Sequence, residues 1–333
     1  MHDSFHAFAN EMIDYAGLFP PAELPLDTAI ENYVKHRSQP ESWMLARFIY
    51  PARRLDQLAA YANVIQSRGD PFRFSIILTG DEKPESFLEA LDSDLKEIGG
   101  FRQRHGDRVR IEMIEARMPT RLLKGTDPQE IGVFLKGAAE RIRGAGLQDA
   151  EVFFESAPPP QIWGATTQEI IQALSIVESP RLGYKIRCGG VTATAFPPVE
   201  QVARTLVLCR EAGVPLKATA GLHHPIRHDD DSLRTKVHGF LNLFGAALLA
   251  HAHGLDEEKL QPILEDEASE SFVFDEEGFA WRDLPIETAK IAELRGRAIR
   301  SFGSCSFDEP RNDLYQLGLL RKGETDNPGR STS

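Results

Sequence analysis

Short apolar runs alternate with longer amphipathic segments along the chain as far as Gly221. Most of the runs are rich in β-branched or aromatic residues, and most end in Gly or Pro, which is typical of strands and their boundaries. We therefore expect strands at 12–19, 43–51, 72–80, 110–117, 151–158, 183–190 and 214–221.

The segments between these runs have the apolar spacing of amphipathic helices. In 55–69, apolar residues recur at i, i+3, i+4 and i+7, so they share one face of a helix. Asp127-Pro128 and Gly146 are the residue types preferred at a helix start and just past a helix end. We expect helices at 26–37, 55–69, 85–100, 127–146, 166–179 and 197–213.

The order of strands and helices predicts parallel βαβ units. Because seven such units occur without a GxGxxG fingerprint, an α/β fold of the (β/α)8 TIM-barrel type is favoured over a dinucleotide-binding sheet. The eighth strand has two candidate places. Segment 237–254 is either a short strand at 239–243 followed by a helix or one buried helix. In the second case the last strand lies near 301–307.

The pattern changes after Leu255. A charged helix follows, then a β-hairpin at 271–283 with an Asp-Glu-Glu-Gly turn, then a helix at 286–303. We expect a barrel catalytic domain at 1–255 and a C-terminal hairpin and helix extension packed on it at 256–320. The polar tail at 321–333 is expected to be disordered.

Composition narrows the class of protein. The chain has 333 residues and a formal net charge of −12, from 38 Lys and Arg against 50 Asp and Glu. An acidic chain without a basic run is a poor partner for nucleic acid or an anionic membrane. No run of about 18 apolar residues is present, the N-terminus lacks signal-peptide features, and the three cysteines have no CxxC spacing. We expect a cytoplasmic protein with no nucleic-acid or membrane partner.

Charged residues inside buried strands mark the candidate site. A barrel carries its active site at the carboxyl ends of its strands, and a charge in an otherwise apolar strand is costly without partners. The residues that this rule selects are Asp14, Arg47, Glu115, Glu155, Lys185, Arg187 and Lys217. They are either a catalytic site or structural ion pairs that fill a polar layer of the barrel.

The alternation of side chains along a strand refines this set. Lys185 and Arg187 point to the same side of their strand because successive side chains alternate with period two. Glu112 and Glu115 have opposite parity, so only one of them can face inward. Glu115 is preferred because it lies closer to the carboxyl end of its strand.

Two lysines on consecutive strands suit Schiff-base chemistry. An ordinary lysine amine has a pKa near ~10 and is protonated at neutral pH, whereas burial and a second cation lower that pKa. One of Lys185 and Lys217 could be the nucleophile and the other the cation that lowers its pKa, with Glu155 or Glu115 as the proton carrier. Arg187 is expected to hold an anionic group of the substrate. The expected substrate-binding residues are Arg187, Arg47, Asp14, Thr219, Gly189, Gly190, His223 and His224.

The lysine pair also carries a resemblance. A lysine in 183–190 and another in 214–221, the second followed by small residues and glycine, are similar to those of the class I deoxyribose-phosphate aldolase group of barrels. That resemblance implies an aldolase-type lyase without a cofactor, with Lys185 as the Schiff-base residue and Lys217 as its pKa partner. The substrate would be a small anionic carbonyl compound. The longer stretches KIRCGGVTATAFP, KATAGLHHP and FGSCSFDEP resemble an uncharacterised group of bacterial proteins of similar length, which implies no reaction.

Histidines support a competing interpretation. His223 and His224 follow the seventh expected strand, and with Glu155 they could hold a divalent metal such as Zn²⁺ or Mn²⁺ in an isomerase or hydrolase. A non-enzymatic barrel that binds a small molecule is the third alternative, and a homo-oligomer is compatible with all three. Cys305, in the small-residue stretch FGSCSFDEP, is either a nucleophile or a buried structural thiol.

Overall fold

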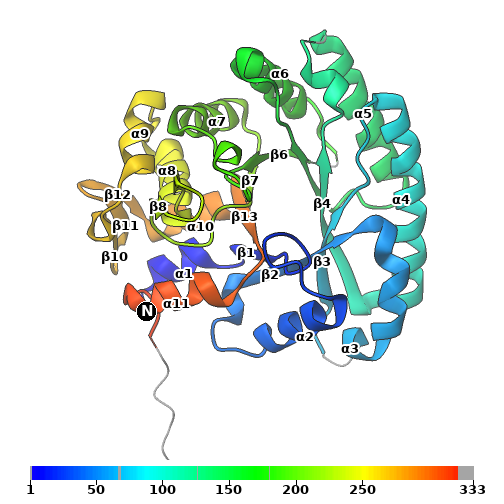
Figure 1. Ribbon diagram of the computed structural model, residues 1–333, viewed down its shortest axis with the longest axis horizontal. Helices are drawn as coiled ribbons and strands as arrows, with labels where there is room; N and C mark the ends of the chain where they lie inside the picture. The colour runs from blue at the N-terminus through cyan, green and yellow to red at the C-terminus, as the bar shows by residue number, and fades with distance from the viewer. Residues whose placement is uncertain (1, 67–68, 126, 180, 322–333) are drawn as a thin grey trace, which may run out of the picture.

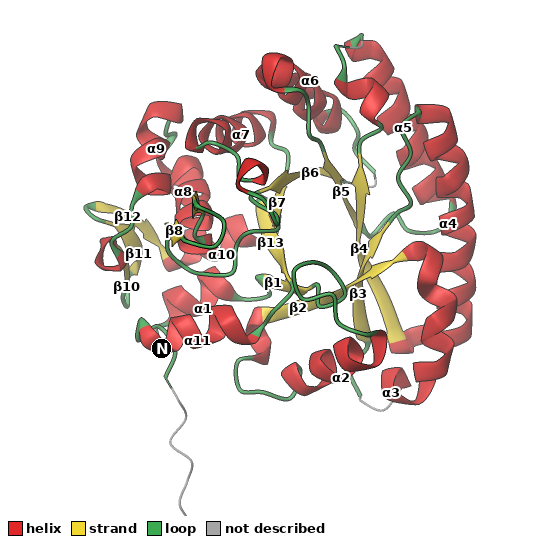
Figure 2. Cartoon of the chain, viewed as in Figure 1, coloured by secondary structure: helices red, strands yellow, loops and turns green. Residues whose placement is uncertain are grey.

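Eight parallel strands close into a barrel with helices around it (Figures 1 and 2). The computed structural model describes residues 2–66, 69–125, 127–179 and 181–321. The strand order around the barrel is β1-β13-β7-β6-β5-β4-β3-β2. The strands are β1 (Ile13–Tyr15), β2 (Leu45–Pro51), β3 (Phe72–Ile77), β4 (Val109–Arg117), β5 (Glu151–Glu155), β6 (Leu182–Arg187), β7 (Leu216–Thr219) and β13 (Ile299–Ser304). The fold is therefore a (β/α)8 TIM barrel, as the sequence predicts.

An α-helix follows each barrel strand before the next barrel strand begins, and a 3-10 helix precedes it after β2, β4, β5 and β6. The 3-10 helix after β2, η2 (Ala52–Tyr61), lies where a longer α-helix was expected. The helices are α1 (Asp3–Ala9), α2 (Leu26–His36), α3 (Ala62–Gln66), α4 (Pro84–His105), α5 (Pro128–Gly144), α6 (Trp163–Ser175), α7 (Val199–Ala212), α8 (Phe240–His253), α9 (Glu257–Glu265), α10 (Thr288–Arg297) and α11 (Asp308–Gln316). Within the ranges given above, no helix is both long and apolar enough to cross a bilayer.

The eighth strand takes the second of its two expected places. Segment 240–253 is a single helix, α8, whose residues from Phe240 to Ala250 are all buried. A helix that is apolar on every face needs cover on every face. The barrel covers α8 on one side, and a further layer formed by α9, α10 and a three-stranded antiparallel sheet covers it on the other. The strands of this sheet are β10 (Phe272–Phe274), β11 (Gly278–Trp281) and β12 (Leu284–Glu287).

The expected domain boundary at residue 255 is wrong. The last barrel strand and the helix after it, β13 and α11, both lie beyond that residue. The segment 257–297 is therefore an insertion between α8 and β13, and the extension does not follow a completed barrel. The expected hairpin at 271–283 is present as β10 and β11, with β12 as a third strand. The expected disordered tail lies outside the described residues except for Arg321.

The insertion also holds the N-terminal helix in place. Phe5 packs edge-on against Phe274 with ring centroids 5.0 Å apart, and Phe8 lies 5.5 Å from Phe279. All four rings are buried. Helix α1, the insertion and the barrel therefore share one apolar core, which leaves the opposite, carboxyl ends of the strands open for a site.

Candidate active site

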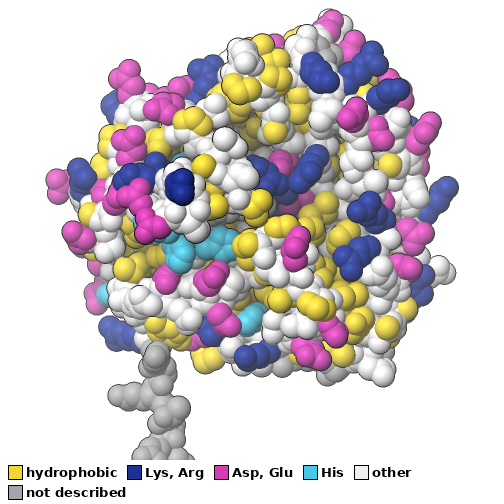
Figure 3. Space-filling view, viewed as in Figure 1, with side chains coloured by type: hydrophobic (Ala, Val, Ile, Leu, Met, Phe, Trp, Pro, Cys, Tyr) yellow, Lys and Arg dark blue, Asp and Glu magenta, His cyan; other side chains and the backbone are white. Residues whose placement is uncertain are grey.

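A cavity of about 1150 Å³ lies at the carboxyl ends of the barrel strands. Figure 3 shows a hollow on the viewed face, with dark-blue Lys or Arg side chains in it and cyan histidine side chains beside it. The loops after β6, β7 and β13 form much of its wall, together with a small antiparallel ribbon of β8 (His228–Asp230) and β9 (Thr235–Val237). Of the expected site residues, those that line the cavity are Glu115, Glu155, Lys185, Arg187, Gly190, Thr219, His223 and His224.

Lys185 lies between two carboxylates in the floor of this cavity. Its neighbours across the sheet are Glu155 on β5 and Lys217 on β7, because the three residues are paired in register. The Lys185 Nζ atom is 2.8 Å from Oε2 of Glu115 and 2.9 Å from Oε2 of Glu155. Lys185, Glu115 and Glu155 were all selected from the sequence, and the structure brings their side chains together.

These ion pairs shift the pKa values of all three groups. Burial alone lowers the pKa of Lys185, but the attraction of Glu115 and Glu155 outweighs it and raises that pKa. Burial raises the pKa of Glu115, and the two lysines overcome that penalty and lower it to about 2. Burial likewise raises the pKa of Glu155, and Lys185 and Arg187 bring it down to about 2. At neutral pH the cluster is fully ionised.

Lys217 lies beneath the cavity and does not line it. Its side chain is completely buried. The ammonium pairs with Asp14, lies 3.2 Å from Oε1 of Glu115, and donates to Oγ of Ser301 at 3.2 Å. Glu115 thus joins the two lysines, with one oxygen on each. The expectation that Lys217 lowers the pKa of Lys185 is wrong for the free protein, because carboxylates stand between and beside the two cations.

Six buried charges, together with four partly exposed ones at the two ends, form one alternating chain through the barrel. Each member contacts the next, and acid and base alternate throughout. In order, they are Glu11, Arg73, Glu112, Arg47, Asp14, Lys217, Glu115, Lys185, Glu155 and Arg187. Five carboxylates balance five cations, so the network is neutral as a whole. This arrangement meets the requirement that buried charges be paired.

Asp14 and Arg47 belong to the lower part of this chain. Oδ1 of Asp14 accepts from Nη1 of Arg47 at 3.3 Å and from its backbone N–H at 3.1 Å. Neither residue lines the cavity. The expectation that these two bind substrate is wrong, because they lie a layer below the surface that a ligand can reach. They support Lys217 instead.

Glu112 and Glu115 both join the network, against the expected alternation. The pairing between β3 and β4 shifts register at Glu112: Phe74 pairs with Ile111, but Ser75 pairs with Met113. A bulge of this kind adds one residue and resets the direction of the side chains. Period-two alternation therefore fails here, and both glutamates point into the barrel.

Arg187 ends the chain at the cavity wall. Its Nε donates to Oε1 of Glu155 at 2.8 Å, and its side chain is 35% exposed. Of the chain members that line the cavity, it is the most accessible cation. A guanidinium at such a place can pair with a carboxylate or phosphate of a ligand.

The two glycines after β6 have different positions. Gly190 lines the cavity, as expected for a substrate-binding residue. Gly189 instead packs inside the wall, where an added Cβ would lie 2.8 Å from Cα of Gly221 and 2.5 Å from the Phe196 ring. Its role is to let the loops after β6 and β7 approach each other, and no direct contact with a ligand is needed.

The two adjacent histidines contact α11. His223 Nδ1 is 2.9 Å from Oε2 of Glu309, and His224 Nδ1 is 2.6 Å from Oδ2 of Asp313. In the part of the chain that the structure describes, no group of three or more His, Cys, Asp or Glu side chains is placed to hold a metal ion. The alternative ligand set of His223, His224 and Glu155 is thus not assembled.

Several residues that contact the ion-pair chain or belong to it were not selected from the sequence. Ser75 donates to Glu115 at 2.5 Å, and Ser301 donates to Asp14 at 2.5 Å; both serines are buried. Each is a polar residue inside an apolar strand, the same signal that selected the charged residues. Arg73 and Glu11 carried no such signal, because they lie near strand ends where charge is ordinary.

The fold and the cavity define a (β/α)8 barrel with a neutral ion-pair chain that is buried in its middle and ends at the barrel mouth. No protein-family model and no curated protein sequence matches the chain.

The shifted carboxyl groups make stability depend on pH in a defined direction. Glu115 and Glu155 have folded-state pKa values of about 2 against an ordinary 4.5, so the unfolded chain binds protons more readily. Their stabilisation is complete above about pH 5 and is lost as the pH falls from about 4.5 to about 2. Each contributes on the order of 3 kcal/mol.

Urea unfolding between pH 7 and pH 3 measures this dependence. The free energy of unfolding should fall steeply below about pH 4.5, and Glu155→Gln should flatten that fall. Glu200→Gln, at an exposed position on α7, is the matched control and should leave the slope unchanged. An equal slope for wild type and Glu155→Gln would contradict the assignment.

Proposed function

We propose that the protein is an aldolase-type lyase that forms a Schiff base between Lys185 and a small anionic carbonyl compound. The observation that supports this most strongly is the geometry around Glu115. One oxygen contacts Lys185 at the cavity floor, and the other contacts fully buried Lys217 below it. Two lysines joined by one carboxylate, with only the upper one facing a cavity, separate a reactive amine from a fixed supporting cation.

The proposed chemistry starts with a proton transfer from Lys185. Its Nζ must lose a proton before it can attack. Glu115, at 2.8 Å, and Glu155, at 2.9 Å, both contact it and both line the cavity. Glu155 is the proposed acceptor because its second cation, Arg187, also lines the cavity, where a substrate can reach it. The free amine then forms a C–N bond to the carbonyl carbon as the C=O π electrons move to oxygen. Glu155 protonates that oxygen to give a hydroxyl, then takes a proton from the nitrogen and passes it to the hydroxyl, and loss of water gives the iminium ion.

Substrate binding itself favours the proton transfer. Arg187 is one of the two cations that hold the pKa of Glu155 down. An anionic group of the substrate that pairs with Arg187 competes with Glu155 for the guanidinium. The pKa of Glu155 then rises toward its ordinary value, and its affinity for the Lys185 proton increases. The amine is released when the correct class of substrate is present.

Lys217 has a supporting role in this proposal. It holds the second oxygen of Glu115 and is itself fixed by Asp14 and Ser301. When Lys185 becomes a neutral amine, Glu115 keeps a cationic partner and does not become an isolated buried charge. The cost of deprotonating Lys185 is thereby reduced.

Exchange of substrate C–H protons with solvent tests this function. An iminium ion acidifies the adjacent C–H bond, so the wild-type protein should exchange those protons of pyruvate, 2-oxobutanoate or glyceraldehyde 3-phosphate in D₂O, followed by NMR. Glu155→Gln should slow the exchange by about 10²- to 10⁴-fold, the usual contribution of a general acid–base residue. Glu200→Gln should match wild type.

Two results would count against the proposal. The first is the absence of exchange above the protein-free rate with all three compounds. The second is equal exchange by Glu155→Gln and wild type, which would remove Glu155 from the proton transfer.

A further inference from the structure

Cys305, His223 and Glu309 form a second reactive cluster on the cavity wall. Cys305 follows β13, His223 lies in the loop after β7, and Glu309 is in the first turn of α11. Because β7 and β13 are neighbours in the barrel, their following segments lie side by side. The Cys305 Sγ atom is 4.0 Å from Nε2 of His223, and Nδ1 of the same ring is 2.9 Å from Oε2 of Glu309. All three residues line the cavity.

Glu309 fixes the orientation of the His223 ring, so that Nδ1 faces Glu309 and Nε2 faces the Cys305 sulfur. A carboxylate only accepts hydrogen bonds, so Nδ1 carries the proton and donates it. Nε2 then faces the Cys305 sulfur, where it can hold the proton that the thiol gives up. Nucleophile, base and orienting acid thus stand in the order that thiol activation requires.

The electrostatics of the ring agree with this arrangement. Burial lowers the pKa of His223, but its hydrogen bonds with Cys305 and Glu309 outweigh that effect and raise the pKa to about 10. The imidazolium form of His223, which holds the thiol proton, is therefore stabilised by Cys305 and Glu309.

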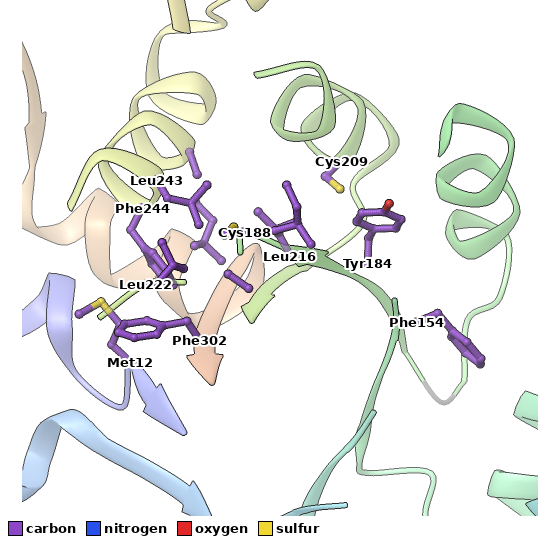
Figure 4. Packing of buried hydrophobic residues seen from close by; sticks show 14 of the residues in the cluster. Met12, Phe154, Tyr184, Cys188, Cys209, Leu216, Leu222, Leu243, Phe244 and Phe302 are labelled. Atoms are coloured by element: carbon purple, nitrogen blue, oxygen red, sulfur yellow. The ribbon is translucent and has the colours of Figure 1, made fainter. Parts of the chain in front are cut away.

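The two other cysteines have a different environment. Cys188 and Cys209 lie among apolar side chains, as Figure 4 shows, and neither lines the cavity. Burial raises the pKa of the Cys188 thiol to about 12 and raises that of Cys209 as well. The chain therefore contains two internal controls for the reactivity of Cys305.

We propose that Cys305 is a second nucleophile of the cavity, with His223 as its base and Glu309 as a positioning residue, and that it adds to small anionic aldehydes. His223 takes the thiol proton, and a bond forms between sulfur and the carbonyl carbon. The C=O π electrons move to oxygen, which receives the proton from His223. The product is a thiohemiacetal, and neither an oxidant nor a reductant is needed. The inference goes beyond the proposed function because no step involves Lys185.

The choice of an anionic aldehyde follows from the rest of the cavity. Arg187 offers a partly exposed guanidinium on the same surface, which suits a carboxylate or phosphate group. An aldehyde is the least hindered carbonyl for a cysteine residue that is only 8% exposed.

Alkylation of the native protein tests the nucleophile and its base. Iodoacetamide, followed by peptide mass spectrometry, should label Cys305 well before Cys188 and Cys209. His223→Asn should slow labelling of Cys305 by at least about 10-fold at pH 7, because no base then lies beside the sulfur to take the thiol proton. Circular dichroism confirms the fold of the variant. An unchanged rate in folded His223→Asn would overturn the proposal.

Two variants of Glu309 separate its positioning role from packing. Glu309→Gln keeps an oxygen that accepts from Nδ1 and should retain most of the labelling rate. Glu309→Ala removes the acceptor and should slow labelling to the level of His223→Asn. If both variants label at the wild-type rate, Glu309 does not position the ring.

Protection by glyoxylate, a small anionic aldehyde, tests the ligand class. It should slow labelling of Cys305 in wild type and equally in Lys185→Arg, which keeps a positive charge at this position but cannot form an imine. Acetaldehyde, which lacks the anionic group, should protect only at much higher concentration. Protection that disappears in Lys185→Arg would assign the occupancy to the lysine and overturn aldehyde addition at Cys305.

Discussion

Lys217→Met should lower the free energy of unfolding by about 3–5 kcal/mol, the usual cost of removing one partner from a buried ion pair. Lys217 is fully buried, and its ammonium contacts two carboxylates, Asp14 and Glu115. Methionine fills a similar volume but leaves both carboxylates with one cation fewer in a dry environment. Urea titration followed by circular dichroism measures the change.

A second substitution distinguishes loss of charge from loss of packing. Adding Asp14→Asn to Lys217→Met removes one of the stranded charges, so the double variant should be more stable than the sum of the two single effects predicts. Lys290→Met is the matched control, since its pair with Glu293 is on the surface and should contribute at most about 1 kcal/mol. A Lys217→Met protein within 1 kcal/mol of wild type would show that the network does not stabilise the barrel.

Lys185→Arg should abolish every reaction that passes through an imine. Arginine keeps the positive charge between Glu115 and Glu155, so the alternating chain of charges stays balanced and the fold is retained. A guanidinium is never deprotonated in proteins and cannot condense with a carbonyl. Loss of exchange to the protein-free rate, with unchanged urea unfolding, therefore assigns the chemistry to the amine and not to the charge.

The barrel could be predicted from the sequence because its strands are short, apolar and regularly spaced. All seven expected strands of the first part are present, although β1 is reduced to Ile13–Tyr15. The eighth remained ambiguous because 240–250 has a single polar side chain, that of Asn242, and so lacks the periodicity that distinguishes helix from strand. Its helical state depends on cover from the insertion, which local sequence does not reveal.

The charged members of the site were predictable for a different reason. A charge in a buried strand is costly, so Glu115, Glu155 and Lys185 stood out from their apolar neighbours. Which of the selected residues pair with each other was not predictable. The bulge at Glu112 changes which side chains face inward, and the contacts of Lys217 depend on closure of the barrel. The pKa of Lys185 was expected to be lowered and is raised instead, because strand register and barrel closure place two carboxylates against its ammonium.

The most direct test of the central claim is borohydride trapping at Lys185. Protein incubated with pyruvate, glyoxylate or glyceraldehyde 3-phosphate is reduced, digested and mapped by mass spectrometry. We predict a stable adduct on the peptide that contains Lys185 with at least one of these compounds, none at this position in Lys185→Arg, and no comparable adduct on exposed Lys259. No adduct at Lys185 with any of the three, or equal modification of Lys259, would contradict the assignment of Lys185 as the Schiff-base residue.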